Sequence, residues 1–387
     1  MNKKIFFVIW GNPKFYQTLI SLSKNFSDKN YKVFILAKNT KKKLDIIENV
    51  DFGKNGKILY NPLHSKYLPN ILNFFMFIIY SVFFYLNKKP THTILFNQHS
   101  LFIIPFIKFF RKKNDKIIYH NFDFDFFSNL KTIREKLLSL CEVYLSRFCN
   151  YLVFPTTKRA NLFQKISKDN KKKFLEFKNC FPKSFSIKKS DKFERFLRYN
   201  NLLNKKIICH LGTISPGHFI ENTIKSARYI KKNSVIIIAG TSINNYAYDL
   251  NKMIKKFNLT NKVFIIENVK NSLWFEILFK SDLGICFYEN TNLSHQHMSG
   301  TSQKFNNYVF ANIPMIVNNN KDFLQFKSNF DIFDVVDPKN PKKIGKSINS
   351  LLTDKARYYK IKKNLKISFS KELNFEKQFK QSYGVFL

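Results

Sequence analysis

The stretch Thr301-Ser302-Gln303-Lys304-Phe305-Asn306-Asn307-Tyr308, continuing as Ala311-Asn312-Ile313-Pro314-Met315-Ile316-Val317, decides the fold of this chain. A polar segment with one lysine leads into a short predicted helix, and a turn with a proline then precedes a buried strand. In an open α/β sheet, ligands bind beyond the carboxyl ends of the strands, where loops lead into helices. The free N–H groups at a helix N-terminus suit a phosphate. The stretch therefore predicts an α/β sheet with an anion site near Lys304.

Short apolar runs alternate with helical stretches along the rest of the chain, which is typical of parallel sheets covered by helices. The predicted strands of the first half are Ile5–Trp10, Lys32–Ala37, Thr93–Asn97, Lys116–His120 and Tyr151–Phe154. Those of the second half are Lys206–Leu211, Ser234–Ala239, Lys262–Ile266, Leu283–Tyr288 and Met315–Val317. We therefore expect two doubly wound, Rossmann-like domains with a cleft between them.

The length of 387 residues suits two such domains. A polar, lysine-rich stretch from Ser184 to Asn204 interrupts the alternation and predicts the junction. We expect an N-terminal domain over residues 1–190, a C-terminal domain over 205–365, and a helix over 366–387 that returns to the first domain. Ser370 is the predicted cap of that last helix.

The composition is strongly basic. The chain has 66 lysines and arginines against 26 acidic residues, a formal net charge of +40, and only eight of the basic residues are arginine. One interpretation is a coding bias carried on solvated faces, because Lys, Asn, Ile and Phe are all over-used together. The other is attraction to a polyanion, either anionic lipid or nucleic acid.

Five scattered cysteines without a CxxC pair indicate a reducing compartment. The apolar run from Ile71 to Leu86 is shorter than the roughly 20 residues that span a bilayer. A second run, from Leu101 to Phe110, is broken by Pro105 and followed by basic residues. Both runs are compatible with helices buried in the domain, or with an aromatic and lysine-rich surface resting on anionic lipid.

Two segments resemble the GT-B glycosyltransferases, specifically the family 4-like group (glycosyl transferases group 1). The stretch around Lys304 is similar to that family's pattern of Pro-Asn-Lys, Glu-Tyr and Gly-x-Pro-x-Ile. The stretch from His210 to Asn222 resembles the family's first glycine-bearing loop. The resemblance covers most of the chain and is clearest from Lys206 to Val317. It implies two Rossmann-like domains and a nucleotide-sugar donor bound to the second.

When the family's roles are assigned to the matching residues of this chain, they imply a donor site in the second domain. The implied donor-binding residues are Gly212, Ser215, Gly217, His218, Ser302, Lys304 and Asn307. Lys304 would meet the diphosphate, and Asn307 would hold the ribose. The chain departs from the family at His218, where a basic residue is usual, and at Ser299 and Asn307, which stand where the family has two glutamates. Donor handling could therefore differ, or the protein could be a binding module without activity.

The catalytic candidates are His120 and Asp123, which follow a predicted strand at its carboxyl end. They would position the acceptor hydroxyl or the donor sugar, or else cap the strand by bonding to backbone. Asp123-Phe124-Asp125 spells a DxD motif, but the two-domain plan and the matched C-terminal motifs argue against a metal there. His295 and His297 are two residues apart, but no third ligand lies at metal-site spacing. We expect no metal and no cofactor.

The resemblance implies a glycosyltransferase that moves a sugar, with retention, from a nucleoside diphosphate to a hydroxyl. The expected acceptor is a lipid-linked or cell-surface glycan precursor, such as one for lipopolysaccharide or capsule. The expected location is the cytoplasm, peripheral on the inner membrane face. The alternatives are a nucleotide-sugar epimerase of the same fold and a basic protein that binds nucleic acid or membrane without catalysis. No nucleic-acid motif is present, so no nucleic-acid partner is expected.

Overall fold

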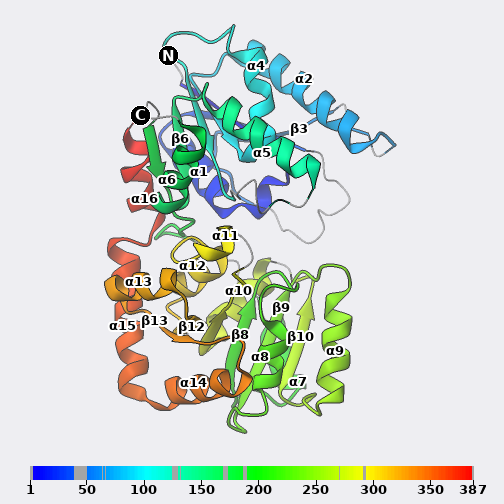
Figure 1. Cartoon of the computed structure of the whole chain (residues 1–387), viewed down its shortest axis with the longest axis vertical. Coiled ribbons are helices and arrows are strands. Elements are labelled where there is room, and N and C mark those ends of the chain that lie inside the picture. The colour runs from blue at the N-terminus through cyan, green and yellow to red at the C-terminus, as the bar shows by residue number, and fades with distance from the viewer. Residues whose placement is uncertain are drawn as a thin grey trace. The chain divides into compact units, whose positions relative to one another are not determined.

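The computed structural model of the chain describes residues 3–38, 50–62, 64–65, 67–123, 130, 132–168, 173–185, 190–269, 271–290 and 293–385. It divides into two compact units, each with its own parallel sheet (Figure 1). Of the described residues, those within 3–38, 50–179 and 378–385 form unit 1, and those within 180–377 form unit 2. The prediction of two doubly wound α/β domains is confirmed.

Unit 1 contains a seven-stranded sheet in the order β3-β2-β1-β4-β5-β6-β7. Its strands are β1 (Lys4–Ile9), β2 (Lys32–Ala37), β3 (Gly56–Tyr60), β4 (His92–Phe96), β5 (Lys116–His120), β6 (Tyr151–Phe154) and β7 (Lys173–Glu176). Each neighbouring pair is parallel. Because the order reverses between β1 and β4, the loops that follow these strands diverge there, which is where this class of sheet binds ligands.

The helices of unit 1 follow local sequence signals. They are η1 (Pro13–Phe15), α1 (Gln17–Asp28), α2 (Asn70–Lys88), α3 (Asn97–Ser100), η3 (Leu101–Ile103), α4 (Ile104–Ile107), α5 (Ile133–Ser146), α6 (Thr157–Ser167) and η5 (Tyr383–Val385). Thr132 and Glu135 form a reciprocal capping box at the start of α5. Lys89 adopts a left-handed conformation at the end of α2, which closes the helix before Pro90.

Unit 2 contains a six-stranded parallel sheet in the order β10-β9-β8-β11-β12-β13, which reverses between β8 and β11. Its strands are β8 (Lys206–Leu211), β9 (Ser234–Gly240), β10 (Val263–Glu267), β11 (Leu283–Cys286), β12 (Met315–Asn318) and β13 (Phe333–Val336). The strand β9 is buried along its whole length, which explains its continuous apolar sequence.

The helices of unit 2 are α7 (Lys192–Tyr199), α8 (Ile220–Ser226), α9 (Tyr246–Lys256), α10 (Asn271–Lys280), α11 (Leu293–Gln296), α12 (Gln303–Phe310), α13 (Lys321–Phe330), α14 (Pro341–Thr353) and α15 (Lys355–Lys371). Four of them begin at a Ser, Asn or Asp side chain that accepts a backbone N–H of the first turn. These caps are Ser302, Asn320, Asn340 and Asp354.

The structure differs from the sequence predictions at the C-terminal helix and within the predicted junction. The segment predicted as a single terminal helix breaks, because α15 continues through Ser370 and a separate helix, α16 (Phe375–Gln381), follows. The cap of α16 is Asn374, whose side chain accepts the N–H of Lys377, so the prediction for Ser370 was wrong. Within the predicted junction, Phe193, Leu197 and Leu202 are buried in the core of unit 2.

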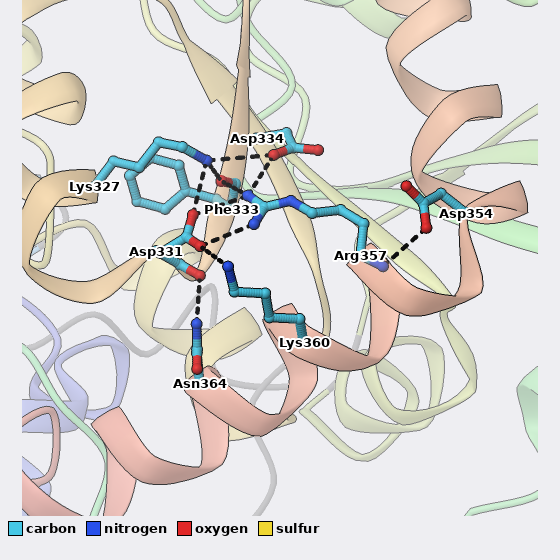
Figure 2. A network of polar contacts seen from close by, with 8 residues as sticks. All are labelled: Lys327, Asp331, Phe333, Asp334, Asp354, Arg357, Lys360 and Asn364. Atoms are coloured by element: carbon cyan, nitrogen blue, oxygen red, sulfur yellow. Dashed lines mark hydrogen bonds and ion pairs between the residues drawn. The ribbon is translucent and has the colours of Figure 1, made fainter.

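A network of ion pairs joins α13, β13 and α15 within unit 2 (Figure 2). The Arg357 guanidinium donates two hydrogen bonds to Asp331, at 2.8 and 2.9 Å, and one to Asp334, at 2.8 Å. These bonds hold the pKa of the Asp331 carboxyl well below its usual range. Lys327, one helical turn before Asp331, lies 3.1 Å from the same carboxylate. The network stabilises the outer strand of the sheet, where β13 has a neighbour only in β12.

Candidate functional site

The position of α12 is fixed by Tyr308. Its hydroxyl donates to the carbonyl of Cys209 in β8, at 2.9 Å, and accepts the N–H of Leu211, at 3.2 Å. Gly284 in β11 makes room for the ring, because a Cβ at that position would lie 2.7 Å from it. Tyr308 therefore holds α12 against β8 and β11, the two strands at which the order of the sheet reverses.

Lys304 lies one helical turn before Tyr308 and is only 6% exposed. Its Nζ is 3.3 Å from His210 Nε2 and 4.8 Å from the ring centre of Tyr288. Its stem passes beside Gly212, where a Cβ would come within 2.9 Å of Lys304 Cε. Burial lowers the pKa of the Lys304 ammonium to about 8. Within the described part of the chain, no carboxylate forms an ion pair with it, so this buried cation faces only neutral groups.

Three histidines lie around Lys304. The ring centre of His218 is 6.0 Å from that of His210, 5.8 Å from that of His295 and 5.3 Å from that of Tyr288. Burial, followed by the charge of Lys304, lowers the pKa of His210 well below its usual value and that of His218 to about 3. Both rings are therefore neutral at pH 7, and the His210 Nε2 that faces Lys304 accepts from it.

Two loops close around these side chains. Gly217, with φ of 93°, adopts a conformation that favours glycine, and its carbonyl accepts the N–H of Glu289 at 2.7 Å. The ring of His295 lies over Gly217 and its Nδ1 is 3.1 Å from the Glu289 carbonyl. Ser302 caps α12 and also hydrogen-bonds the hydroxyl of Tyr288. The loop after β8 and the loop after β11 thus meet at the N-terminus of α12.

The structure brings together most of the predicted donor-binding residues. Gly212, Gly217, His218, Ser302 and Lys304 all contribute to one cluster, and Ser215 is half-buried in the same loop. A buried ammonium, a helix N-terminus and a glycine-bearing turn suit an anion with several oxygens. Within the described ranges, no group of three or more His, Cys, Asp or Glu side chains is arranged to hold a metal ion.

Sequence reasoning did not select His210 or Tyr288 for this site. His210 lies inside β8, where a histidine is indistinguishable from any other buried residue until its neighbour is known. Tyr288 follows β11, at a position that the sequence predicts as the end of a strand. A signal for His210 does exist, because it is the one polar side chain in the run Ile207-Ile208-Cys209-His210-Leu211, at the carboxyl end of the strand.

The structure places the two positions at which the family has glutamates in hydrogen-bonded surroundings. Asn307 is buried in α12, with its amide oriented so that the oxygen accepts from Trp274 Nε1 at 3.3 Å and the nitrogen donates to the Gln303 carbonyl at 3.2 Å. Ser299 is buried as well, and its backbone N–H donates to the Asp322 carboxylate at 2.9 Å. The carboxylate near Ser299 thus comes from α13 rather than from the loop itself.

The two catalytic candidates lie in different environments in unit 1. His120, the last residue of β5, is fully buried among aromatic rings, and its Nδ1 is 2.6 Å from the hydroxyl of Tyr383. Burial lowers the pKa of His120 to about 3, so the ring is neutral. Asp123 has a side chain that is 77% exposed and lies 3.8 Å from Arg159. Asp125, the second acid of the DxD motif, lies outside the described residues.

No protein-family model matches the sequence, and no curated protein matches it. Solved structures do match. HepE from Anabaena, in complex with UDP and glucose, is similar with a TM-score of 0.75 and 14% identity over 98% of both chains. Sucrose-phosphate synthase from Thermosynechococcus elongatus gives a TM-score of 0.72 at 11% identity, covering 99% of this chain and 98% of that one.

WaaG, a glycosyltransferase involved in lipopolysaccharide biosynthesis, gives a TM-score of 0.66 at 11% identity and covers 97% of this chain and 98% of that one. These likenesses extend over nearly the whole length of each chain. They show that the chain has the GT-B fold, as the sequence motifs predicted.

Proposed function

We propose that the protein is a glycosyltransferase, and that unit 2 binds its nucleoside-diphosphate sugar donor with the diphosphate at Lys304. The observation that carries the proposal is the buried Lys304 ammonium, which lies at the N-terminus of α12, beside Gly212, without a carboxylate partner among the described residues. An unpaired buried charge is costly, and a phosphate would compensate it. The bound UDP and glucose in the HepE structure support a donor of this class.

The residues of the cluster would share the contacts to the donor. Lys304 Nζ and the free N–H groups of α12 would neutralise the diphosphate, and Ser302 and Ser215 would donate hydroxyl hydrogen bonds to it. His218, a neutral ring, would donate one ring N–H to a phosphate oxygen. A ribose hydroxyl at Asn307 would compete with Trp274 Nε1–H for the same amide oxygen.

In the proposed reaction, the bond between the sugar and the diphosphate breaks, and a hydroxyl of the acceptor forms the new glycosidic bond. The diphosphate leaves with both electrons of the broken bond, and the hydroxyl proton is taken up by it or by solvent. Stabilisation of that leaving group by Lys304 would supply much of the rate acceleration, together with the positioning of both substrates. The scheme retains configuration and uses no metal, and His120 and Asp123 stay the candidates for acceptor positioning.

We place the reaction in the cytoplasm, on a lipid-linked or cell-surface glycan precursor. Five free cysteines suit a reducing compartment. The involvement of WaaG in lipopolysaccharide biosynthesis supports an acceptor of this kind.

The proposal is tested by thermal unfolding of the purified chain with UDP-, GDP-, dTDP- and CMP-sugars. One donor should raise the midpoint, and Lys304→Met, which removes the charge but keeps much of the volume, should abolish that rise. Lys255→Ala, an exposed lysine of α9, is the matched control and should respond as wild type does. Stabilisation that persists in Lys304→Met, or none with any donor, would refute the diphosphate site.

A nucleotide-sugar epimerase of the same fold is distinguished by the need for an acceptor. A glycosyltransferase consumes the donor and releases the nucleoside diphosphate fastest when a glycan acceptor is present. An epimerase interconverts sugars on the intact donor with no acceptor. Chromatography of the donor after incubation alone, and then with a membrane-glycan extract, separates these two outcomes.

A further inference from the structure

The helix α2 has two apolar faces. Phe77, Phe84 and Tyr85 face the core, and the ring centre of Phe84 lies 5.1 Å from that of Phe6 in β1. On the opposite side, exposed apolar side chains recur along one stripe of the helix. Ile71, Phe75, Ile79 and Phe83 are each between 54% and 60% exposed. The helix α2 (Asn70–Lys88) is longer than the run from Ile71 to Leu86, so the expectation that this segment is too short to span a bilayer was wrong. Among the described residues, it is the one helix long and apolar enough to cross a membrane by length and composition.

Its packing identifies α2 as part of the unit rather than as a crossing segment. Besides the phenylalanine contacts with β1, the Asn73 side chain is buried and bonds the backbone of Ser65 and Leu68. A helix held in the core on one side and apolar on the other suits a position in the plane of an interface.

The helix α5 departs from the usual amphipathic pattern, because its buried positions are mostly polar. Its buried positions include Ser139, Glu142 and Ser146, and Glu142 accepts hydrogen bonds from Tyr119 and Asn121 inside the unit. Its exposed face carries large apolar side chains at helical spacing. These are Ile133, Leu137, Leu140 and Tyr144, which are between 54% and 79% exposed. A helix of a globular protein normally turns such a stripe to the core, so this one is available to a partner.

A third element connects the two stripes. Phe106, Phe109 and Phe110 are exposed in and just after α4. The helix α4 packs against α2, and η3, immediately before it, packs against α5. Figure 1 shows α2, α4 and α5 together on one side of unit 1. We call the exposed side chains of α2, α4 and α5 the apolar surface. Its extent exceeds the single exposed apolar side chains that are normal on a soluble protein.

Basic residues border the apolar surface. Lys108 lies over the rings of Phe109 and Phe148, and Arg111, Lys112 and Lys113 follow it directly. Arg134, in the first turn of α5, is exposed as well. The acidic residues in these segments are fewer, and one of them, Asp115, accepts the backbone N–H of Lys112. The edge of the surface is therefore cationic.

We propose that the apolar surface docks unit 1 onto an anionic lipid bilayer. Apolar and aromatic side chains would enter the boundary between headgroups and acyl chains, while the lysines meet the anionic headgroups. A second copy of the chain would bring the same cationic edge against itself in a chain of net charge +40, which opposes that occupant. The inference concerns unit 1 and does not rest on the donor site.

The test is co-sedimentation of the full chain with vesicles of phosphatidylcholine alone and with a one-third share of phosphatidylglycerol. The chain should bind the anionic vesicles, and the triple variant Ile133→Gln, Leu137→Gln, Leu140→Gln should bind them roughly ten-fold more weakly. Lys112→Glu with Lys113→Glu should weaken binding similarly and reduce its salt dependence. Because all of these side chains are exposed, the variants should keep the wild-type circular dichroism spectrum and melting midpoint.

The matched control is the triple variant Tyr248→Gln, Leu324→Gln, Ile367→Gln, which removes exposed apolar side chains from unit 2. It should bind vesicles as wild type does. The proposal is overturned if wild type fails to bind anionic vesicles, if neutral vesicles bind it equally well, or if the α5 variant binds unchanged. Self-association in sedimentation velocity that the α5 variant abolishes, without vesicle binding, would assign the surface to a second copy.

Discussion

Both units contain a parallel sheet, but different side chains are buried at the carboxyl ends of its strands. Unit 2 has a buried lysine between neutral histidines, where β8 and β11 diverge. Unit 1 has a buried histidine, His120, packed between Phe96, Phe122 and Tyr383. Both histidines are neutral, but only His210 faces a cation. The comparison shows that topology decides where a site can form, whereas the side chains decide which charge it can hold.

The largest effect is expected when Lys304→Met is compared with His120→Phe. Removal of the Lys304 charge should weaken donor binding by about 3 kcal/mol, roughly a hundred-fold, because a buried phosphate would lose its partner. The same variant should unfold no more easily than wild type at pH 7, because an ammonium buried without a carboxylate opposes folding. His120→Phe should leave the donor affinity unchanged. Calorimetric titration measures the donor affinity, and melting curves measure the stability. An equal loss of donor affinity in His120→Phe would show that the two units do not differ in this way.

Glu142, a buried carboxyl of unit 1, should change the free energy of unfolding by a similar amount. Burial raises the pKa of Glu142 to about 7, so the folded chain keeps a proton that the unfolded chain loses. Its contribution to the free energy of unfolding is therefore full below pH 4.5 and falls by about 3 kcal/mol as the pH rises to 7.

Glu142→Gln, which still accepts from Tyr119 and Asn121, should remove this loss. The stability of the variant relative to wild type should rise by about 2–3 kcal/mol between pH 5 and pH 8. Urea unfolding at the two pH values measures it. A difference between the two proteins that does not change with pH would show that Glu142 does not titrate in this range.

A smaller effect concerns the titration of Lys304 itself. Its pKa of about 8 in the free protein should rise when a diphosphate binds, so binding requires the protonated ammonium. The dissociation constant should be flat below pH 7 and increase about ten-fold between pH 7 and pH 9. Lys304→Met should bind weakly at every pH, without this rise. Fluorescence titration with the stabilising donor provides the measurement, and a flat profile in wild type would contradict the assignment.

The smallest expected effect is a loss of stability in unit 1. Tyr383→Phe removes the hydroxyl that lies 2.6 Å from His120 Nδ1, in a fully buried position. Loss of this bond should lower the free energy of unfolding by about 1 kcal/mol. Donor affinity should not change, because the contact lies wholly in unit 1. A matched loss of donor affinity would instead connect the aromatic cluster to binding.

Much of the fold was predictable because buried parallel strands have continuous apolar sequences. The strands β2, β5, β6 and β8 begin and end at the predicted residues. The strands β3, β7 and β13 were missed. They form outer strands of the two sheets, so only one neighbour covers them and their short sequences carry polar residues that weaken the apolar signal.

The candidate site was predictable only in part, because only some of its residues carry a local sequence signal. Lys304 and Gly212 carry local signals, a helix N-terminus and a strand-to-helix turn, and the structure places them in contact. His210 carries a weaker signal, as the one polar side chain in an apolar strand, and Tyr288 carries none, because a residue just after a strand is recognised only through its neighbours. His120 shows the reverse case, since its place at the end of a strand did not reveal the aromatic rings that enclose it.

The sequence by itself determined the two parallel sheets, most of their strands and the turn-helix segments that could hold a phosphate, because hydrophobic periodicity and capping residues act over a few positions. Only the tertiary structure decided which polar groups meet. Lys304 and His210 are 94 positions apart, and His120 and Tyr383 are 263 positions apart. Their environments follow from the packing of whole helices on sheets. The exposure of the apolar stripe of α5 is also a tertiary result, because spacing alone would have turned that stripe inward.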